Sequence, residues 1–196
     1  MIQMQNPTIT IQKTELLSNN HYILNKVTFD YKKSTEDSET QTREVYDRGN
    51  GAVILLYNTS QKTVILTRQF RLPTYLNNNT TGMLIEACAG MLDEDNPIDC
   101  IIRETEEETG YRLSTVKKIF QSYMSPGAVT EILHFFIGEY SPKMKISNGG
   151  GLEEEHEHIE VLEYSFDKAY QMIASGEITD AKIIMLLQYA KINLPL

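Results

Sequence analysis

Two features of the sequence predict an α+β fold for this chain. Most apolar residues fall in short, strand-like runs, and the few segments with helical periodicity are widely spaced rather than following each strand. A length of 196 residues with 41% hydrophobic content allows one sizeable core but not two comfortable domains. We therefore expect a single domain built around a sheet with a small number of helices.

The N-terminal segment is expected to form a β arm of that single domain. Residues 8–31 alternate in places between apolar and polar side chains, which predicts two strands. Residues 32–42 are polar and predict a hairpin turn or mobile tip, before the chain extends again over 43–48. Residues 1–45 carry too little apolar surface for a core of their own, so we expect them to lie on the main part, 46–196, or on a second subunit.

The remaining elements are predicted from apolar runs, turn residues and helical periodicity. The expected strands cover 52–57, 63–70, 83–89, 116–123, 132–140 and 159–164, the expected helices 167–174 and 180–192, and the expected loops 58–61, 72–82 and 141–158. The last of these loops is long, and long loops in compact domains are commonly functional.

The clearest helix signal lies between Gly90 and Tyr111. Asn96 is a suitable N-cap, Pro97 tolerates the first helical position, and Asp99 can reach back to the cap. Gly110 is expected to end the helix. At about 100° per residue, one arc is predicted to face the core and a second arc, on the far side, is acidic. The core arc comprises Ile98, Ile101, Ile102, Thr105 and Thr109, and the acidic arc Glu104, Glu107 and Glu108.

The acidic arc is a candidate metal site. Its like charges repel each other at helical spacings, and only Arg103 lies among them. A divalent cation would relieve this repulsion. Carboxylate oxygens with few dedicated ligands suit Mg²⁺, which completes its shell with water and substrate phosphates. The alternative interpretation is an acidic face that is simply solvated.

Charge and cysteine content exclude several classes of function. A net charge of −9 argues against a nucleic-acid binder, and it suits an anionic substrate only if metal ions carry the opposing charge. Cys88 and Cys100 are expected to be buried free thiols, which indicates a reducing compartment. No targeting pattern or membrane-length apolar run is present, so we expect a cytoplasmic protein without a membrane partner.

The acidic helix resembles the Nudix box of diphosphate hydrolases, whose ending REUxEExGU is matched by RETEEETGY at 103–111. The sequence departs from the box in having one residue fewer before the Arg. It also lacks the usual Glu at the seventh position counted from Gly90, a region occupied by Asn96 and the acidic run 93–95, and Thr105 replaces the usual aliphatic residue. The resemblance implies an α/β/α sandwich around a mixed β-sheet.

Further segments resemble the Nudix branch that cleaves nucleoside diphosphate sugars. They are REVYDRG at 43–49, RQFR at 68–71, AG at 89–90, SPGAVTE at 125–131, GGGLEEEHEHIEV at 149–161 and GEITDAK at 176–182. Pro126, 15 residues past Tyr111, marks the same branch. The resemblance implies a Mg²⁺-dependent pyrophosphatase, with GDP-mannose as the expected substrate and ADP-ribose as the alternative. A Nudix-fold module that binds a nucleotide without cleaving it is the competing hypothesis from another class.

The resemblance also implies the roles of individual residues. The implied metal ligands are the Ala89 carbonyl, Glu104, Glu108 and an acid of the long loop. That acid is Glu157 on alignment, while Glu155 and Glu153 remain open; Glu157 is also the first candidate for the catalytic base and Glu107 the second. The implied substrate contacts are Tyr22, Thr42, Arg43, Glu44, Arg71, Gly90, Met91, Glu131 and Lys182. Relatives dimerise through the arm, so a homodimer is expected in which Tyr22 enters the partner's site.

Overall fold

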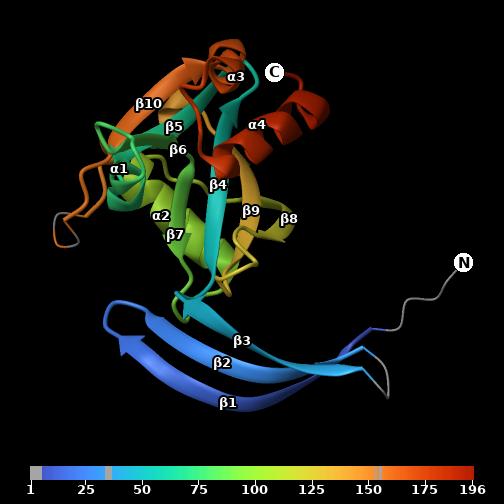
Figure 1. Ribbon diagram of the computed structural model, residues 1–196. Coiled ribbons are helices and arrows are strands. Elements are labelled where there is room, and N and C mark those ends of the chain that lie inside the picture. The colour runs from blue at the N-terminus through green and yellow to red at the C-terminus, as the bar shows by residue number, and fades with distance from the viewer. Residues whose placement is uncertain (1–5, 34–36, 153, 155) are drawn as a thin grey trace, which may run out of the picture. The chain divides into compact units, whose positions relative to one another are not determined.

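The structure of the protein is a computed structural model that describes residues 6–33, 37–152, 154 and 156–196. These residues form two compact units. The first contains the described chain up to Asn50 together with Tyr123–Ile132, and the second contains Gly51–Ser122 and Leu133–Leu196. A sheet and separate helices are present (Figure 1), so the predicted α+β class is confirmed.

The first unit contains an antiparallel sheet in the order β1-β2-β3. Its strands are β1 (Thr8–Asn19), β2 (Ile23–Lys32) and β3 (Ser38–Asp47). The two strands predicted within residues 8–31 are thus confirmed, but the turn predicted for 32–42 is wrong from Ser38 onward. Polar pairs across the sheet explain the difference, since the Thr40 hydroxyl donates to the Asp30 carboxylate at 2.7 Å.

The second unit is built on a mixed sheet in the order β10-β5-β4-β9-β8, with β6 pairing with β5 and β7 with β4. Its strands are β4 (Gly51–Asn58), β5 (Thr63–Phe70), β6 (Met83–Glu86), β7 (Cys88–Met91), β8 (Lys117–Tyr123), β9 (Ile132–Glu139) and β10 (Glu160–Ser165). β4 and β9 are parallel, whereas β4 and β5 are antiparallel. The apolar run 52–56 of β4 is 0% exposed, as expected for a central strand covered on both faces.

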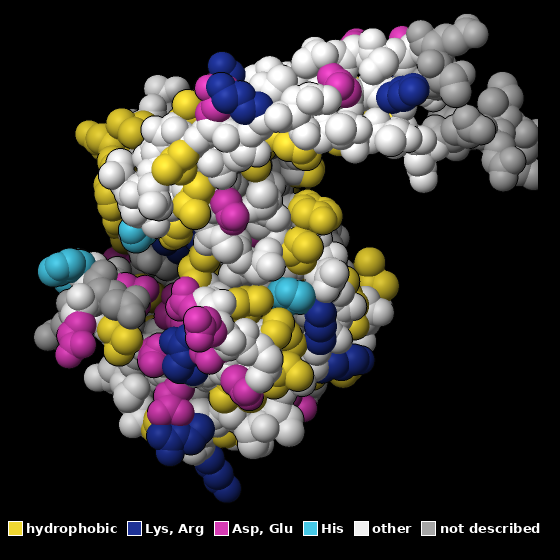
Figure 2. Space-filling view, turned by 90° about the horizontal axis from the view of Figure 1, so that it is seen from below, with side chains coloured by type: hydrophobic (Ala, Val, Ile, Leu, Met, Phe, Trp, Pro, Cys, Tyr) yellow, Lys and Arg dark blue, Asp and Glu magenta, His cyan; other side chains and the backbone are white. Residues whose placement is uncertain are grey.

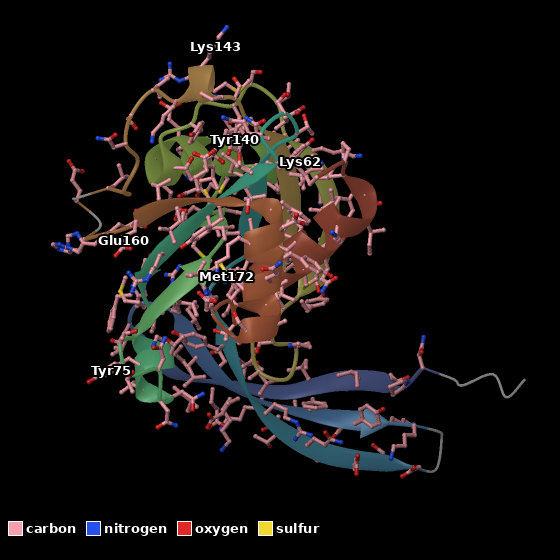
Figure 3. All side chains as sticks on the ribbon, turned by 90° about the horizontal axis from the view of Figure 1, so that it is seen from above. Lys62, Tyr75, Tyr140, Lys143, Glu160 and Met172 are labelled. Atoms are coloured by element: carbon pink, nitrogen blue, oxygen red, sulfur yellow. The ribbon has the colours of Figure 1, made fainter. Side chains whose placement is uncertain are left out.

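Helices cover both faces of this sheet. They are α1 (Leu72–Leu76), α2 (Pro97–Thr109), α3 (Phe166–Ser175) and α4 (Ala181–Asn193), and a 3-10 helix covers Pro142–Met144. The view from above in Figure 3 shows α2 on one side of the strands and α3 with α4 on the other. Met172 of α3, labelled there, is 1% exposed and belongs to the core. Within the described part of the chain, none of the helices has the length and apolar character needed to cross a bilayer.

Three local predictions are corrected by the structure. The loop predicted for 72–82 contains α1, which begins next to Pro73, a residue suited to the first helical turn. The single strand predicted for 83–89 is split at Ala87, where the chain stops pairing with β5 and begins pairing with β4. Ile98, assigned to the core arc, is 47% exposed, because the buried stripe of α2 is rotated toward Glu108.

Candidate active site

The acidic helix α2 begins and ends where the sequence predicts. The side-chain oxygen of Asn96 accepts hydrogen bonds from the N–H groups of Ile98 at 3.0 Å and Asp99 at 3.1 Å. The Asn96 amide also donates to the Asp99 carboxylate. Gly110 adopts the left-handed conformation with a φ of 77°, which ends the helix. Local capping therefore fixes where the helix that carries the acidic residues begins and ends.

The acidic arc of α2 is partly withdrawn from solvent. Glu108 is 2% exposed, and the side chains of Glu104 and Glu107 are 15% and 26% exposed. Arg103 contacts Glu104 at 3.0 Å and Glu107 at 3.3 Å, and acidic side chains gather around basic ones on the face shown in Figure 2. A solvated acidic face does not describe this arrangement, because ionised carboxylates are seldom buried without a partner.

Burial changes the acidity of the two innermost carboxyl groups. It raises the pKa of Glu108 to about 8; the Cys88 thiol opposes this rise, and the charges of Glu104 and Glu157 add to it. Burial likewise raises the pKa of Glu104 to about 7, despite the adjacent Arg103 guanidinium, with further increases from Glu107 and Glu157. These groups are therefore costly to ionise unless a cation joins them.

Strand β7 supplies backbone groups to the same place. The Ala89 N–H donates to the Glu108 carboxylate at 3.3 Å. At Gly90, a Cβ atom would lie 2.2 Å from the Cδ of Glu104, so any other residue there would displace that carboxylate. The carbonyl of the next residue, Met91, accepts a hydrogen bond from the Cys100 thiol at 3.2 Å. Both thiols are free and buried, as predicted.

The long loop returns to the C-terminal end of α2 through three glycines. The N–H groups of Gly150 and Gly151 donate to the carbonyls of Glu108 at 2.9 Å and Glu107 at 3.2 Å. Gly149, Gly150 and Gly151 have φ values of 68°, 115° and 80°, a region that favours glycine. The loop thus satisfies carbonyls that a helix end leaves unpaired, and it fixes the following acidic segment against α2.

Glu157 of the long loop interacts with the acidic residues of α2. Its carboxylate accepts a hydrogen bond from the Leu152 N–H at 3.1 Å and raises the pKa of both Glu104 and Glu108. It lines a cavity of about 500 Å³ with the three glycines, Phe70 and His158. His156 and His158 are exposed. The alternative acids, Glu153 and Glu155, lie outside the described residues.

The carboxylates and the nearby backbone fit a divalent metal ion. They offer hard oxygen donors, and their pKa values are raised by burial first and by neighbouring carboxylates second, so a cation would favour their ionised forms. Among the described residues, no group of three or more acidic, His or Cys side chains is already gathered closely enough to hold an ion. Ion binding would therefore draw these side chains together, with water and substrate oxygens completing the shell.

Two predicted substrate contacts of the second unit meet at a residue that sequence reasoning missed. Arg71 Nε donates to the Glu86 carboxylate at 2.7 Å, and Lys182 Nζ contacts its other oxygen at 3.2 Å. Glu86 is 3% exposed. The available signal was a lone acid inside the apolar run MLIEACAG, because a charge buried in such a strand requires a partner.

Of the other predicted substrate contacts, Gly90 and Met91 lie in β7 of the second unit, and the rest lie in the first unit. Arg48 places its guanidinium carbon 5.4 Å from the centre of the Tyr22 ring and its Nε 3.6 Å from the Glu131 carboxylate, so Tyr22 and Glu131 share one neighbour. Thr42, Arg43 and Glu44 are exposed on β3. Arg43 there donates to the Thr42 carbonyl at 2.8 Å.

Comparison with known proteins agrees with this geometry. Residues 47–187 match the family model of the NUDIX domain, and residues 8–46 match the model described as the GDP-mannose pyrophosphatase NudK N-terminal domain. Since the first match covers more than half of the chain, the protein belongs to the Nudix hydrolase family, whose members generally use a divalent metal ion.

The similar curated proteins share one name. The GDP-mannose pyrophosphatase of Yersinia pestis (strain Pestoides F) is 57% identical over 179 residues, covering 91% of this chain and 89% of that protein. The GDP-mannose pyrophosphatase of Salmonella typhimurium is 53% identical over 182 residues, covering 93% and 94%. The similarity thus extends over the N-terminal arm as well as the acidic helix.

Proposed function

We propose that this protein hydrolyses the diphosphate of GDP-mannose to GMP and mannose 1-phosphate. The observation that carries the proposal is the pair of withdrawn carboxylates, Glu104 and Glu108, packed against Ala89 and Gly90. The relatives named GDP-mannose pyrophosphatase support the choice of substrate. A pair of acids held away from solvent at an energetic cost is typical of a functional site rather than of a surface helix.

Mg²⁺ is the ion we propose, held by the Ala89 carbonyl, Glu104, Glu108 and Glu157. When bound, it supplies positive charge that neutralises the diphosphate and lowers the pKa of a nearby water molecule. Water attacks one phosphorus, the bond from that phosphorus to the bridging oxygen breaks, and the bridging oxygen leaves with the other product. Glu157 accepts the proton of the attacking water, and Glu107 is the second candidate for this role.

The proposed substrate contacts include charged side chains for the phosphates and an aromatic ring for the base. Arg71 and Lys182 meet phosphate oxygens, which an Arg can contact bidentately. The remaining contacts proposed from the resemblance are Gly90 and Met91 in the second unit and Tyr22, Thr42, Arg43, Glu44 and Glu131 in the first. The ring of Tyr22 offers a surface on which a base can stack.

We propose a homodimer that forms through the arm, residues 1–45, with residues 46–196 as the Nudix hydrolase domain. The boundary between the two family matches, at residues 46 and 47, supports this division. Apolar side chains exposed on β1 and β2 support an intersubunit role, since such surface favours association. They are Ile9, Ile11, Leu16, Leu17 and Ile23, which are 48%, 57%, 61%, 49% and 39% exposed. The cytoplasm suits the buried free thiols.

Steady-state kinetics on a panel of nucleotide sugars with Mg²⁺ tests the function. We expect the highest kcat/KM for GDP-mannose, with GMP and mannose 1-phosphate as products; a higher value for ADP-ribose would reassign the substrate. EDTA should abolish turnover and added Mg²⁺ restore it. Binding without hydrolysis of any substrate in the panel would instead support the nucleotide-sensing module.

A further inference from the structure

Glu86 is a buried carboxylate that joins two cations from distant parts of the chain. Arg71 follows the end of β5, Glu86 ends β6, and Lys182 lies in the first turn of α4. Each oxygen of Glu86 has its own cation, since Oε2 accepts from Arg71 at 2.7 Å and Oε1 from Lys182 at 3.2 Å. The side chain of Glu86 is 3% exposed, compared with 43% for Arg71 and 21% for Lys182.

Asp180 extends this arrangement by one residue. One oxygen accepts a hydrogen bond from Lys182 Nζ at 2.7 Å, while the other accepts from the N–H of Ile183 at 3.2 Å and so caps α4. The charges therefore alternate from Arg71 through Glu86 and Lys182 to Asp180, and both carboxylates contact Lys182. Buried ionic networks often stabilise a fold no better than apolar residues of the same size, so a role in function is the better explanation for this one.

The two cations retain donors that Glu86 and Asp180 do not use. Glu86 occupies only the Nε–H of Arg71, and the terminal amino groups of Arg71 have no hydrogen-bond partner among the residues that the structure describes. Lys182 carries three donors, of which Asp180 and Glu86 each use one. Arg71 and Lys182, which we call the cation clamp, can therefore bind phosphate oxygens while Glu86 continues to hold them.

Glu86, which holds the cation clamp, lies close to the acidic site along the chain. Ala89 comes three residues after Glu86, so their Cα atoms are at most about 11 Å apart. One nucleotide sugar is long enough to contact both places. The clamp is thus positioned for the part of the substrate that does not lie on the carboxylates of α2.

We propose that Glu86 is a positioning residue that fixes the geometry of the cation clamp for a substrate phosphate. This inference rests on the proposed function, because it assigns Arg71 and Lys182 to the same substrate. Glu86 touches neither substrate nor reacting atoms. It limits the rotamers of both long side chains, which lowers the conformational entropy lost when phosphate binds.

Glu86→Gln separates positioning from simple charge balance. Gln keeps the volume but holds both cations poorly, so positioning predicts a KM for GDP-mannose raised about tenfold or more with kcat within about threefold. Charge balance alone predicts the opposite sign, because the clamp becomes more positive and should bind phosphate more tightly. An unchanged or lower KM would overturn the proposal. Glu106→Gln is the matched control, since it removes the carboxylate of the surface pair with Arg112 at 2.7 Å and should change neither constant.

Two further variants keep the proposal testable if Glu86→Gln folds poorly. Glu86→Asp keeps the charge but is one methylene shorter and cannot reach both cations at the observed distances, so KM should again rise; a wild-type KM would contradict positioning. In an Arg71→Gln background, Glu86→Gln should raise KM less than it does alone, because one of the two side chains that Glu86 positions is already lost. Full additivity would show that Glu86 does not act through Arg71.

Calorimetric titration with GDP distinguishes this proposal from the proposed function. If the wild type binds GDP but does not hydrolyse GDP-mannose, the proposed function is wrong. The proposal for Glu86 can still be tested then, because Glu86→Gln should bind GDP more weakly than the wild type. If the wild type hydrolyses GDP-mannose and Glu86→Gln binds GDP as tightly as the wild type, the positioning role of Glu86 is wrong and the proposed function stands. Absence of GDP binding by the wild type counts against both.

Discussion

Removing metal ions should make the stability of this protein fall as pH rises, and Glu108 should be the main cause. Burial raises the pKa of Glu108 from 4.5 to about 8. At about 1.4 kcal/mol for each pH unit, this difference is worth roughly 4 to 5 kcal/mol of unfolding free energy. Glu108 titrates together with Glu104, whose pKa is raised to about 7, so the measured effect belongs to the pair.

The sign follows from proton binding. A carboxyl group with a raised pKa in the folded state binds its proton more tightly there than in the unfolded chain. Its stabilising contribution is therefore complete below about pH 4.5 and is lost as pH rises through about 8. Several kcal/mol is a large part of the stability of an ordinary domain, so the loss should be easily measured.

Urea denaturation in EDTA at several values between about pH 5 and 8 measures this effect. The wild type should lose several kcal/mol over this range, whereas Glu108→Gln should show a much flatter profile, because Gln cannot ionise. Glu106→Gln is the control on the same helix. The hydrogen bond from Arg112 lowers the pKa of Glu106, so any contribution of Glu106 changes below this range.

Mg²⁺ should restore the stability of the wild type at about pH 8, since a cation favours the ionised carboxylates, and it should do much less for Glu108→Gln. Parallel pH profiles for the wild type and Glu108→Gln would refute the reasoning. They would mean that the burial of this carboxylate does not disfavour its charge.

Three further predictions concern the site. Changing Gly90 to Ala should lower kcat by about 100-fold by displacing Glu104, whereas Gly127→Ala, where a Cβ meets nothing within 4 Å, should leave kcat unchanged. The acid of the long loop is identified by changing Glu153, Glu155 and Glu157 to Gln one at a time. Only the residue that acts in catalysis should show a large loss of kcat, and equal, mild effects in all three would favour Glu107 as the base. Mixing inactive Tyr22→Ala and Glu108→Gln chains should restore activity through heterodimers, and no recovery despite proven subunit exchange would rule out a shared site.

Local signals explain why α2 could be predicted from the sequence. The cap at Asn96, the stop at Gly110 and the clustering of the acids all lie within a single short segment. The burial of Glu108 has another origin, because the glycine loop that covers the C-terminal end of α2 comes about 40 residues later in the chain. Periodicity identifies a face of a helix, but it does not show which later segment will pack on that face.

The incorrect predictions have the same physical cause, which is contact between distant segments. Ser38 and its neighbours are polar, which predicts a turn, but they pair with β2 through contacts that only the fold provides. Glu86 could be noticed as a charge in an apolar run, whereas its partner Lys182 lies 96 residues away. An ion pair between residues so far apart in the sequence cannot be predicted from the spacing of residues in one strand.

The segment from Glu86 to Gly90 explains how an acidic protein can accept an anionic substrate. At its start, a buried carboxylate holds Arg71 and Lys182 in place and leaves donors of both cations available. At its end, the absence of a side chain at Gly90 admits the carboxylate of Glu104. The chain changes pairing partner between these points, from β5 to β4. The net charge of −9 therefore says little about the site, because attraction for phosphate depends on how this short segment arranges a few cations and the carboxylates that we propose as metal ligands.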